Sequence, residues 1–256
     1  MGYQYMLIVD MTTFWFWFGF VSLSLSSLGI ILLAAKFRRE DRFHALIALA
    51  VTSIATISYY ALARGQADVT IGGNVVVYGR YLDWLFTTPL LLLSLLVIAL
   101  PPVKDVRMTR ERISLIAAVL ASDVLMVVTG LFANLATNTL DIVVWYLASC
   151  GWLLIVLYLM FGEVQRQAFA HSERSGKVYK SLLLFLTFAW VCYPIVWILG
   201  DTGYGVINAN TVAAAYAILD VSAKGIFGIL TLTLLKKLGE KVNPSPKTST
   251  VEASDS

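Results

Sequence analysis

Apolar residues dominate the chain in seven long runs, and short polar segments rich in charged residues separate them. Each run can cross the hydrocarbon core of a bilayer as an α-helix, which takes about 20 residues. None of the runs alternates apolar and polar residues, as the strands of a membrane β-barrel do. Because backbone groups in lipid must pair within their own segment or in a closed barrel, the pattern predicts an all-α bundle of seven transmembrane helices. The predicted spans are residues 12–35, 45–63, 76–100, 114–133, 141–161, 181–200 and 211–235.

The composition is that of a membrane protein. Hydrophobic residues make up 59% of the 256 residues and charged residues 14%, with a mean hydropathy of +0.78, whereas an ordinary soluble domain is about 25% charged. The first run has no basic segment before it and no small-residue cleavage site, which favours a membrane span over a removed signal peptide. We expect one transmembrane domain over residues 1–242 and a disordered tail over 243–256, which is rich in Ser, Thr and Pro.

The basic residues predict how the bundle is oriented. Sixteen of the 19 Lys and Arg residues lie in four groups, which follow the first, third, fifth and seventh runs. Short loops with an excess of Lys and Arg remain on the cytoplasmic side. The N-terminus is therefore predicted outside and the C-terminus inside, in a multi-pass protein of the cell membrane. The net charge of +3 then comes from basic loops that face anionic membrane lipids, and we expect no nucleic-acid partner.

Three acidic residues, Asp83, Asp123 and Asp220, lie inside predicted spans, where a charge costs at least about 2.5 kcal/mol. Lys224 follows Asp220 by four residues, so both lie on one face of their helix. A rise of about 1.5 Å per residue from the predicted inner ends places Asp83, Asp220 and Lys224 near mid-membrane. We expect Lys224 and Arg80, the two basic residues inside spans, to be the partners of these acids.

The third run also presents a polar stripe toward the lysine, because Arg80 and Thr87 lie about one helical turn on either side of Asp83. A salt-bridge cluster that only fixes helix register is one interpretation, although buried ion pairs contribute little to stability. In the other, a lysine in an apolar pocket loses the solvation that favours its ammonium form, and its amine can form a Schiff base with a carbonyl compound. Two flanking aspartates would stabilise that Schiff base in its protonated form.

Three segments of the chain form distinctive motifs, namely RYLDWLFTTPLLLL at 80–93, WVCYPIVW at 190–197 and DVSAK at 220–224. These motifs resemble those of the microbial rhodopsins, and among them the bacteriorhodopsin-like proton pumps. The resemblance covers all seven runs. It implies that Lys224 carries all-trans retinal as a protonated Schiff base. It also implies that Asp83 is the primary counterion and proton acceptor, that Asp220 is a second counterion, and that Arg80 is a gate on the outer side.

The resemblance further implies a retinal slot with aromatic walls. Flat apolar rings suit a flat polyene, although an aromatic stripe is also typical of ordinary core packing. Asp123 matches a buried carboxyl beside the chromophore, where it either tunes colour or bonds to a neighbouring helix; Gly130 and Ser149 match contacts at the ring end. The residues expected at the slot are Trp84, Thr88, Asp123, Met126, Gly130, Ser149, Trp190, Tyr193, Pro194 and Trp197.

The sequence departs from the family pattern in two features. Ser94 stands eleven residues after Asp83, where outward pumps of the family usually carry an Asp or Glu that returns a proton from the cytoplasm. A hydroxyl cannot replace a carboxyl as the donor near neutral pH. The paired glutamates that release protons outside also lack a match, since region 200–213 offers only Asp201, displaced by one place, and Val212 stands at the second position. We expect slow or altered proton movement.

Two functions remain within the family. Asp83 argues against chloride pumps, the set Asp83, Thr87 and Ser94 lacks the sodium-pump pattern, and Asp220 argues against inward proton pumps. The first function is a light-driven outward proton pump that refills slowly through water near Ser94. The second is a photosensor, whose slow cycle gives time to signal a transducer. Ala223 and the complete charged set favour the pump.

The remaining expectations concern partners and other classes of site. We expect retinal and membrane lipids as partners and a homo-oligomer, such as a trimer. Cys150 and Cys192 lie in apolar runs, so no disulfide or zinc site is predicted. The chain is expected to be a transporter or photoreceptor and not an enzyme. A Schiff-base membrane enzyme or a simple channel is the alternative if the protein binds no retinal.

Overall fold

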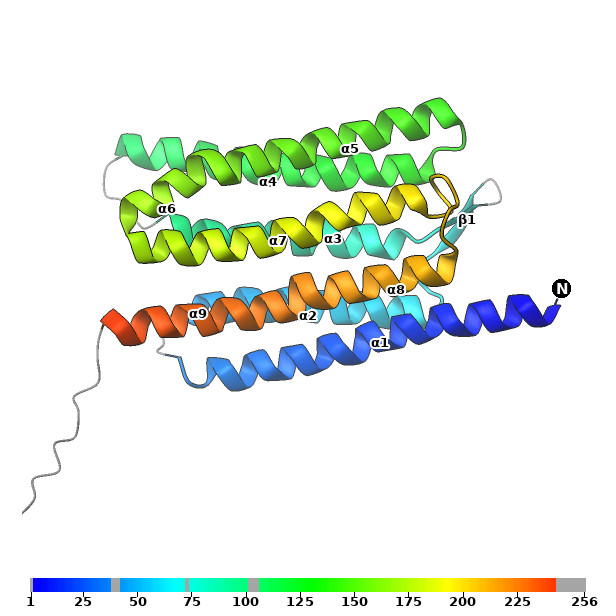
Figure 1. The fold of residues 1–256 in the computed structure, drawn as a ribbon, viewed down its shortest axis with the longest axis horizontal. Coiled ribbons are helices and arrows are strands. Elements are labelled where there is room, and N and C mark those ends of the chain that lie inside the picture. The colour runs from blue at the N-terminus through cyan, green and yellow to red at the C-terminus, as the bar shows by residue number, and fades with distance from the viewer. Residues whose placement is uncertain (1, 38–41, 72–73, 101–105, 243–256) are drawn as a thin grey trace, which may run out of the picture.

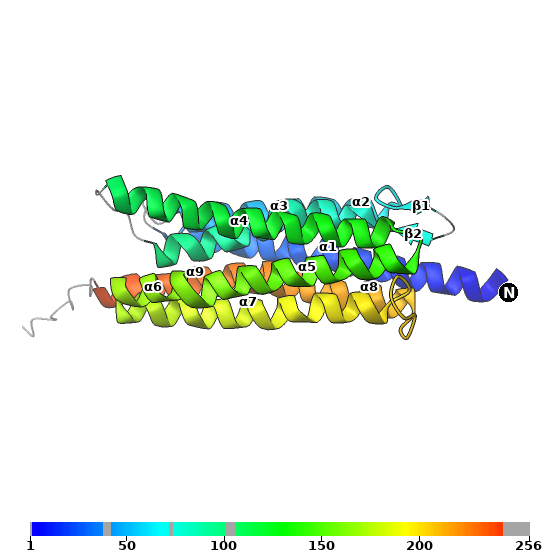
Figure 2. The same cartoon turned by 90° about the horizontal axis from the view of Figure 1, so that it is seen from above.

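The computed structural model describes residues 2–37, 42–71, 74–100 and 106–242. Within them, seven helical stretches are long and apolar enough to cross a membrane, which confirms the predicted seven-helix bundle (Figure 1). The helices run side by side along the long axis, and α1 extends beyond the bundle at its N-terminal end (Figure 2). The tail predicted to be disordered, 243–256, lies outside the described residues.

Each span is one helix or a chain of helices without a break. π-Helical segments lie inside the fifth and seventh spans, where η2 joins α5 to α6 and η3 joins α8 to α9. The elements are α1 (Gly2–Ala34), α2 (Arg42–Ala63), β1 (Val69–Ile71), β2 (Asn74–Val76), α3 (Tyr78–Ala99), α4 (Val106–Leu135), α5 (Thr139–Leu159), η2 (Met160–Val164), α6 (Gln165–His171), α7 (Glu173–Leu199), α8 (Ala209–Asp220), η3 (Val221–Ile226) and α9 (Phe227–Val242).

Several helices begin or end away from the apolar runs. Helix α7 begins at Glu173, eight residues before the apolar run at 181, because polar residues with good helix propensity continue the helix beyond the hydrocarbon region. The span predicted from 76 begins at Tyr78 instead, since Val76 pairs with Val69 in the antiparallel hairpin of β1 and β2. Hydropathy therefore located the spans, whereas local pairing and caps determine their ends.

Side-chain caps begin three of the helices. Asn138 accepts a hydrogen bond from the backbone N–H of Asp141 at 2.9 Å at the start of α5. Ser172 at α7 and Asn208 at α8 accept from the N–H three residues later in the same way. Each cap satisfies a backbone donor that the first helical turn leaves unpaired. These caps define where the chain enters the spans.

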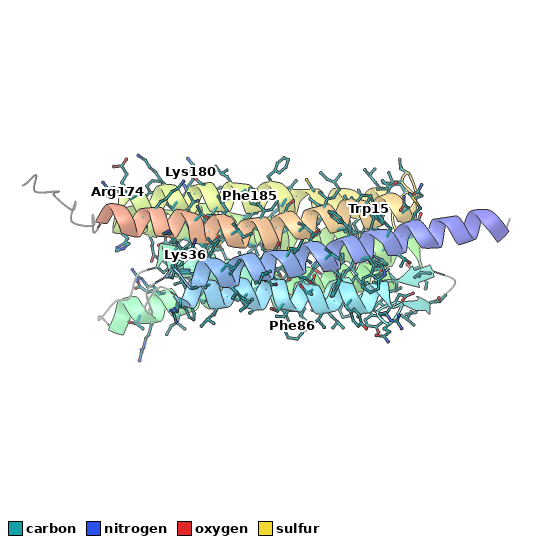
Figure 3. The ribbon with its side chains drawn as sticks, turned by 90° about the horizontal axis from the view of Figure 1, so that it is seen from below. Trp15, Lys36, Phe86, Arg174, Lys180 and Phe185 are labelled. Carbon is teal, nitrogen blue, oxygen red and sulfur yellow. The ribbon has the colours of Figure 1, made fainter. Side chains whose placement is uncertain are left out.

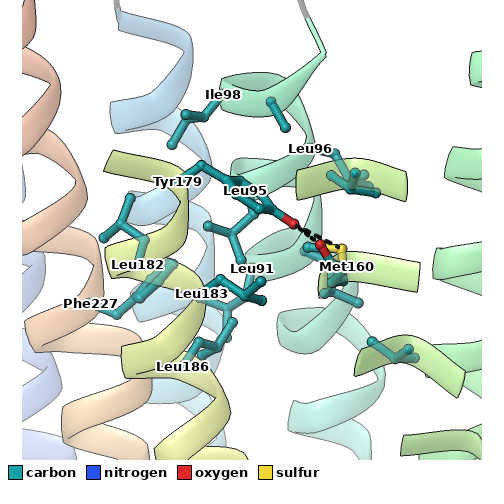
Figure 4. Close-up of a cluster of buried hydrophobic side chains, with 14 of the residues drawn as sticks. Leu91, Leu95, Leu96, Ile98, Met160, Tyr179, Leu182, Leu183, Leu186 and Phe227 are labelled. Atoms are coloured by element: carbon teal, nitrogen blue, oxygen red, sulfur yellow. Dashed lines mark hydrogen bonds between the residues drawn. The ribbon is translucent and has the colours of Figure 1, made fainter. Parts of the chain in front are cut away.

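In the half of the bundle where α9 ends, the core is an apolar cluster of side chains from several helices (Figure 4). Leu95 of α3, Met160 of η2, and Tyr179 and Leu182 of α7 are all fully buried in it. The Tyr179 hydroxyl donates a hydrogen bond of 2.7 Å to the Met160 carbonyl and so satisfies a buried backbone acceptor at the start of the π-helical segment. The cluster holds α3, the fifth span and α7 together beside the last span.

Large apolar side chains also cover the outside of the bundle. Phe86 and Phe188 are 59% and 77% exposed, and Figure 3 shows Phe86 projecting sideways from the bundle. Lys36, Arg174 and Lys180 lie toward the end of the bundle where α9 ends (Figure 3). An apolar belt of this kind suits a lipid surface, because hydrocarbon does not penalise exposed apolar groups.

Candidate functional site

The site is centred on Lys224, which lies in η3 in the middle of the last span and is 2% exposed. Its Nζ forms an ion pair with Asp83 of α3 and a second, 2.7 Å long, with Oδ1 of Asp220 one turn earlier. A buried charge needs such partners because burial removes its hydration. The structure therefore brings together the three residues that the depth estimate placed near mid-membrane.

Asp220 is 1% exposed and accepts hydrogen bonds from two tyrosines. The Tyr59 hydroxyl of α2 donates to Oδ2 at 2.7 Å, and the Tyr193 hydroxyl of α7 donates to Oδ1 at 2.8 Å. The Tyr59 ring lies against Gly19 of α1, where a Cβ would come within 2.2 Å of the ring. Only glycine at position 19 leaves room for this tyrosine, so α1, α2 and α7 all help to fix the Asp220 carboxylate.

Asp83 has fewer partners than Asp220. Its Oδ2 contacts Lys224, but the buried Oδ1 has no hydrogen-bond partner among the described residues. Thr87, predicted to face the lysine, is fully buried, and its hydroxyl donates to the backbone carbonyl of Asp83 at 2.8 Å. Helical Ser and Thr often make this bond to the carbonyl four residues earlier. One carboxylate oxygen of Asp83 therefore remains open to a proton.

Arg80 does not pair with the acids as expected. Within the described part of the chain it forms no ion pair with Asp83 or Asp220, and its guanidinium lies 4.8 Å from the centre of the Tyr216 ring and 5.7 Å from that of Phe16. Lys224 already occupies both carboxylates, and aromatic faces stabilise the remaining cation. Arg80 thus lies one turn from Asp83 on the predicted outer side, as a separate positive charge.

A cavity with about 800 Å³ of empty space adjoins Lys224. Ten of the eleven predicted cofactor-binding residues line it, and the exception is Asp123. That residue is fully buried and accepts a hydrogen bond of 2.8 Å from the lining residue Thr88. The ten are Trp84, Thr88, Met126, Gly130, Ser149, Trp190, Tyr193, Pro194, Trp197 and Lys224.

Contacts between rings and hydroxyls hold the cavity walls in place. Trp197 donates a hydrogen bond of 2.9 Å to the Tyr81 hydroxyl and stacks on Tyr146 with ring centres 5.0 Å apart. Trp84 meets Tyr193 edge to face at 5.2 Å. Fixed, flat walls of this kind suit a rigid planar ligand, because they leave one thin apolar space.

The far end of the cavity depends on a glycine. A Cβ at Gly130 would lie 3.6 Å from the Tyr81 ring, an ordinary contact, but only 3.2 Å from the Ser149 hydroxyl, which is tight. A side chain at Gly130 would therefore narrow the cavity. The lining supplies the amine of Lys224, aromatic walls and a small residue at Gly130. These residues fit retinal, which is an apolar polyene with an aldehyde at one end.

Sequence reasoning missed several residues of the site. Tyr81, Tyr146 and Tyr216 line the cavity, and Tyr59 bonds to Asp220. Tyr216 was detectable, because it precedes Asp220 by four residues and so shares its helix face. Tyr59 gave a weaker signal, namely a hydroxyl inside an apolar run that needs a partner when buried.

The structure also places the positions that depart from the family pattern. Ser94 is 5% exposed and lines a second, smaller cavity that also touches Lys224. Asp201 is exposed in the turn after α7, and Val212 is half-buried near the start of α8. Neither region places a carboxyl beside Arg80 within the described residues.

The sequence matches known proteins over most of its length. The family model of bacteriorhodopsin-like proteins matches residues 10–238. Archaerhodopsin-2 of Halobacterium sp. (strain aus-2) is 35% identical over 213 residues, which cover 81% of this chain and 78% of that protein. Bacteriorhodopsin of Haloterrigena sp. (strain arg-4) is 32% identical over 213 residues, with 81% of each chain covered.

Solved structures show the same fold. Thermophilic rhodopsin from Rubrobacter xylanophilus superposes with a TM-score of 0.84 at 30% identity, covering 90% of this chain and 98% of that one. The light-driven proton pump rhodopsin of Coccomyxa subellipsoidea gives 0.78 at 31% identity, covering 88% and 96%. A proton pumping rhodopsin from the marine alga Acetabularia acetabulum gives 0.79 at 28% identity, covering 90% and 97%.

Proposed function

Because this chain belongs to the bacteriorhodopsin-like family of microbial rhodopsins, we propose that it is a light-driven outward proton pump that binds retinal through Lys224. As a family member it is a multi-pass membrane protein and a transporter rather than an enzyme. The observation that carries the proposal is the position of the Lys224 Nζ. It lies between two buried aspartates, at the edge of an aromatic cavity.

Lys224 is the residue proposed to hold all-trans retinal, as a protonated Schiff base, with Trp84, Trp190 and Trp197 as walls of its slot. When bound, retinal supplies light absorption and an isomerisation that makes the lysine nitrogen more acidic. The chain's own residues then decide where the proton goes. Asp83 contacts Nζ in the resting structure, so the transfer needs no rearrangement of the backbone.

Asp83, and not Asp220, is the proposed acceptor. Tyr59 and Tyr193 donate hydrogen bonds to Asp220, and such bonds stabilise a carboxylate in its charged form. The Oδ1 of Asp83 accepts none among the described residues, so less stabilisation opposes its protonation. Asp220 would keep its charge throughout and hold the lysine side chain in place.

Arg80 is the proposed gate on the outer side. Its guanidinium rests on the Tyr216 ring, one turn outward of Asp83. The positive charge of Arg80 stabilises the charged form of the Asp83 carboxylate and disfavours return of a proton from outside. Lys224 pairs with both aspartates at rest. Once its nitrogen has passed the proton to Asp83, that carboxyl is neutral and attracts Arg80 less, so the guanidinium would be free to move outward.

The inner side is where this chain differs from the usual pumps. Ser94 offers a hydroxyl and no carboxyl, so we propose that protons return from the cytoplasm through water near Ser94 and that this step is slow. Slow return also suits a photosensor with a transducer, and Ser94 is the observation that favours this second function. Similarity to two proton-pumping rhodopsins, from Coccomyxa and Acetabularia, favours pumping.

Illumination of an unbuffered suspension of cells that express the protein tests the proposal. Acidification of the medium that a protonophore abolishes is the expected result. The Lys224→Ala variant, expressed to the same level, is the control and should give no pH change. A photocycle that turns over without any pH change would support the photosensor and contradict the pump.

A further inference from the structure

A second, small cavity, with room for about one water molecule, adjoins Lys224 on the predicted inner side. Its lining includes Ser94 of α3 and Thr231 of α9, and most of the remainder is apolar. Thr231 follows Lys224 by seven residues, which is about two helical turns toward the inner end. Lys224 and Leu91 line this cavity and the retinal cavity as well, so these two side chains separate the two spaces.

Thr231 is unusual among the helical hydroxyls of the described residues. It is 1% exposed, and its Oγ1 has no hydrogen-bond partner among them. Thr233, on the same helix, donates to the Ile229 carbonyl at 2.8 Å, as many helical Ser and Thr among the described residues do. Buried polar groups in proteins nearly always have a partner, often an ordered water. The Thr231 hydroxyl therefore points to a water-binding function of this cavity.

We propose that Thr231 and Ser94 bind water in this cavity and together form the proton return path to Lys224. The proposal rests on the proposed function. A buried water takes two to four polar partners, and the two hydroxyls can supply two of them from two helices. Each hydroxyl accepts one hydrogen bond and donates another. A proton that arrives on its oxygen releases the original hydroxyl proton toward Lys224, so neither residue changes its resting protonation.

The rest of the lining supports a narrow path with few routes. Ile47, Val51 and Phe227 are apolar and buried, and they offer water no hydrogen bonds. Proton transfer then depends on the two hydroxyls, because a water with too few partners does not stay ordered. Thr231 is thus proposed as a positioning residue, which holds water but does not itself act as a fixed donor.

Comparison of Thr231→Val with Thr233→Val tests this proposal, since valine matches the shape of threonine and the second variant removes a hydroxyl that already bonds to its own helix. After retinal is added, the rate at which the deprotonated intermediate decays is measured by flash photolysis at fixed pH. Thr231→Val should slow the decay about 3- to 10-fold, the factor expected for one lost hydrogen bond. Thr233→Val should decay like the wild type. An unchanged rate in Thr231→Val would overturn the proposal.

A crystal structure at high resolution provides a readout that does not depend on the photocycle. Water within hydrogen-bond distance of the Thr231 Oγ1 should be present in the wild type, with or without retinal, and absent in Thr231→Val. A dry cavity in the wild type overturns the proposal even if the protein pumps. If the medium does not acidify but Thr231→Val still slows the decay and loses the water, pumping is refuted while the return path stands.

Discussion

The hydroxyl of Tyr59 donates a hydrogen bond of 2.7 Å to Asp220 across the bundle, although 161 residues separate the two in sequence. Tyr193 donates to the other oxygen of the same carboxylate. A buried carboxylate that accepts bonds from two rigid rings has a fixed position and orientation. Since Asp220 also pairs with Lys224, these tyrosines fix the place of the amine that is proposed to bind retinal.

Loss of this hydrogen bond should weaken the protein and alter its colour. Tyr59→Phe leaves the ring against Gly19 but removes one donor to a buried charge, which costs about 1–3 kcal/mol. We expect thermal bleaching at a lower temperature and a shifted absorption maximum. The adjacent Tyr60→Phe is the control, because Tyr60 is 45% exposed. If both variants behave like the wild type, the Tyr59 bond does not constrain the site.

Lys224→Ala should abolish the visible band that retinal gives to the wild type, because no other lysine among the described residues lines the aromatic cavity. The variant should also be less stable by about 3–5 kcal/mol, since it leaves two buried aspartates without their cation. Absorption spectra and thermal unfolding of purified protein measure the two effects. Lys177→Ala, on an exposed lysine, controls for loss of a positive charge. A coloured Lys224→Ala protein would exclude the proposed linkage.

The pattern of apolar and charged residues in the sequence predicted the spans and the central ion pairs, because both follow from the cost of placing polar groups in hydrocarbon. Charges inside hydrocarbon are costly, so Asp83, Asp220 and Lys224 could be recognised from their sequence positions alone. Helical rise then placed all three near mid-membrane. In the structure, α3 and the last span turn these side chains toward each other, and the three form ion pairs.

The environment and the partners of individual side chains were much harder to predict. Tyr59 and its neighbour Tyr60 look alike in sequence, but one is buried and the other faces outward. Arg80 was expected to pair with acids and instead lies on Tyr216, because Lys224 occupies both carboxylates. Such choices depend on helix rotation and on competition between partners, which a single sequence does not specify.

Asp83→Asn should shift the absorption maximum to the red and prevent the first proton transfer. The charge of Asp83 stabilises positive charge at the Lys224 nitrogen, so its removal lowers the energy needed to move that charge along the polyene. Spectroscopy in the dark and flash photolysis measure the two effects. Asp201→Asn, in the exposed turn after α7, should change neither. An unshifted spectrum in Asp83→Asn would remove Asp83 from the role of counterion.

Without a carboxyl at position 94, return of the proton should depend directly on the proton concentration of the medium. The decay rate of the deprotonated intermediate is then first order in protons and should fall about tenfold for each pH unit, since mass action sets the supply. Ser94→Asp places a donor in the same cavity, so its decay should be faster and nearly independent of pH around neutrality. Ser94→Ala, which adds no donor, should keep the steep pH dependence. Decay of the wild type at one rate from pH 6 to 8, about a hundredfold range of proton concentration, would show that another fixed group supplies the proton and that Ser94 does not limit the cycle.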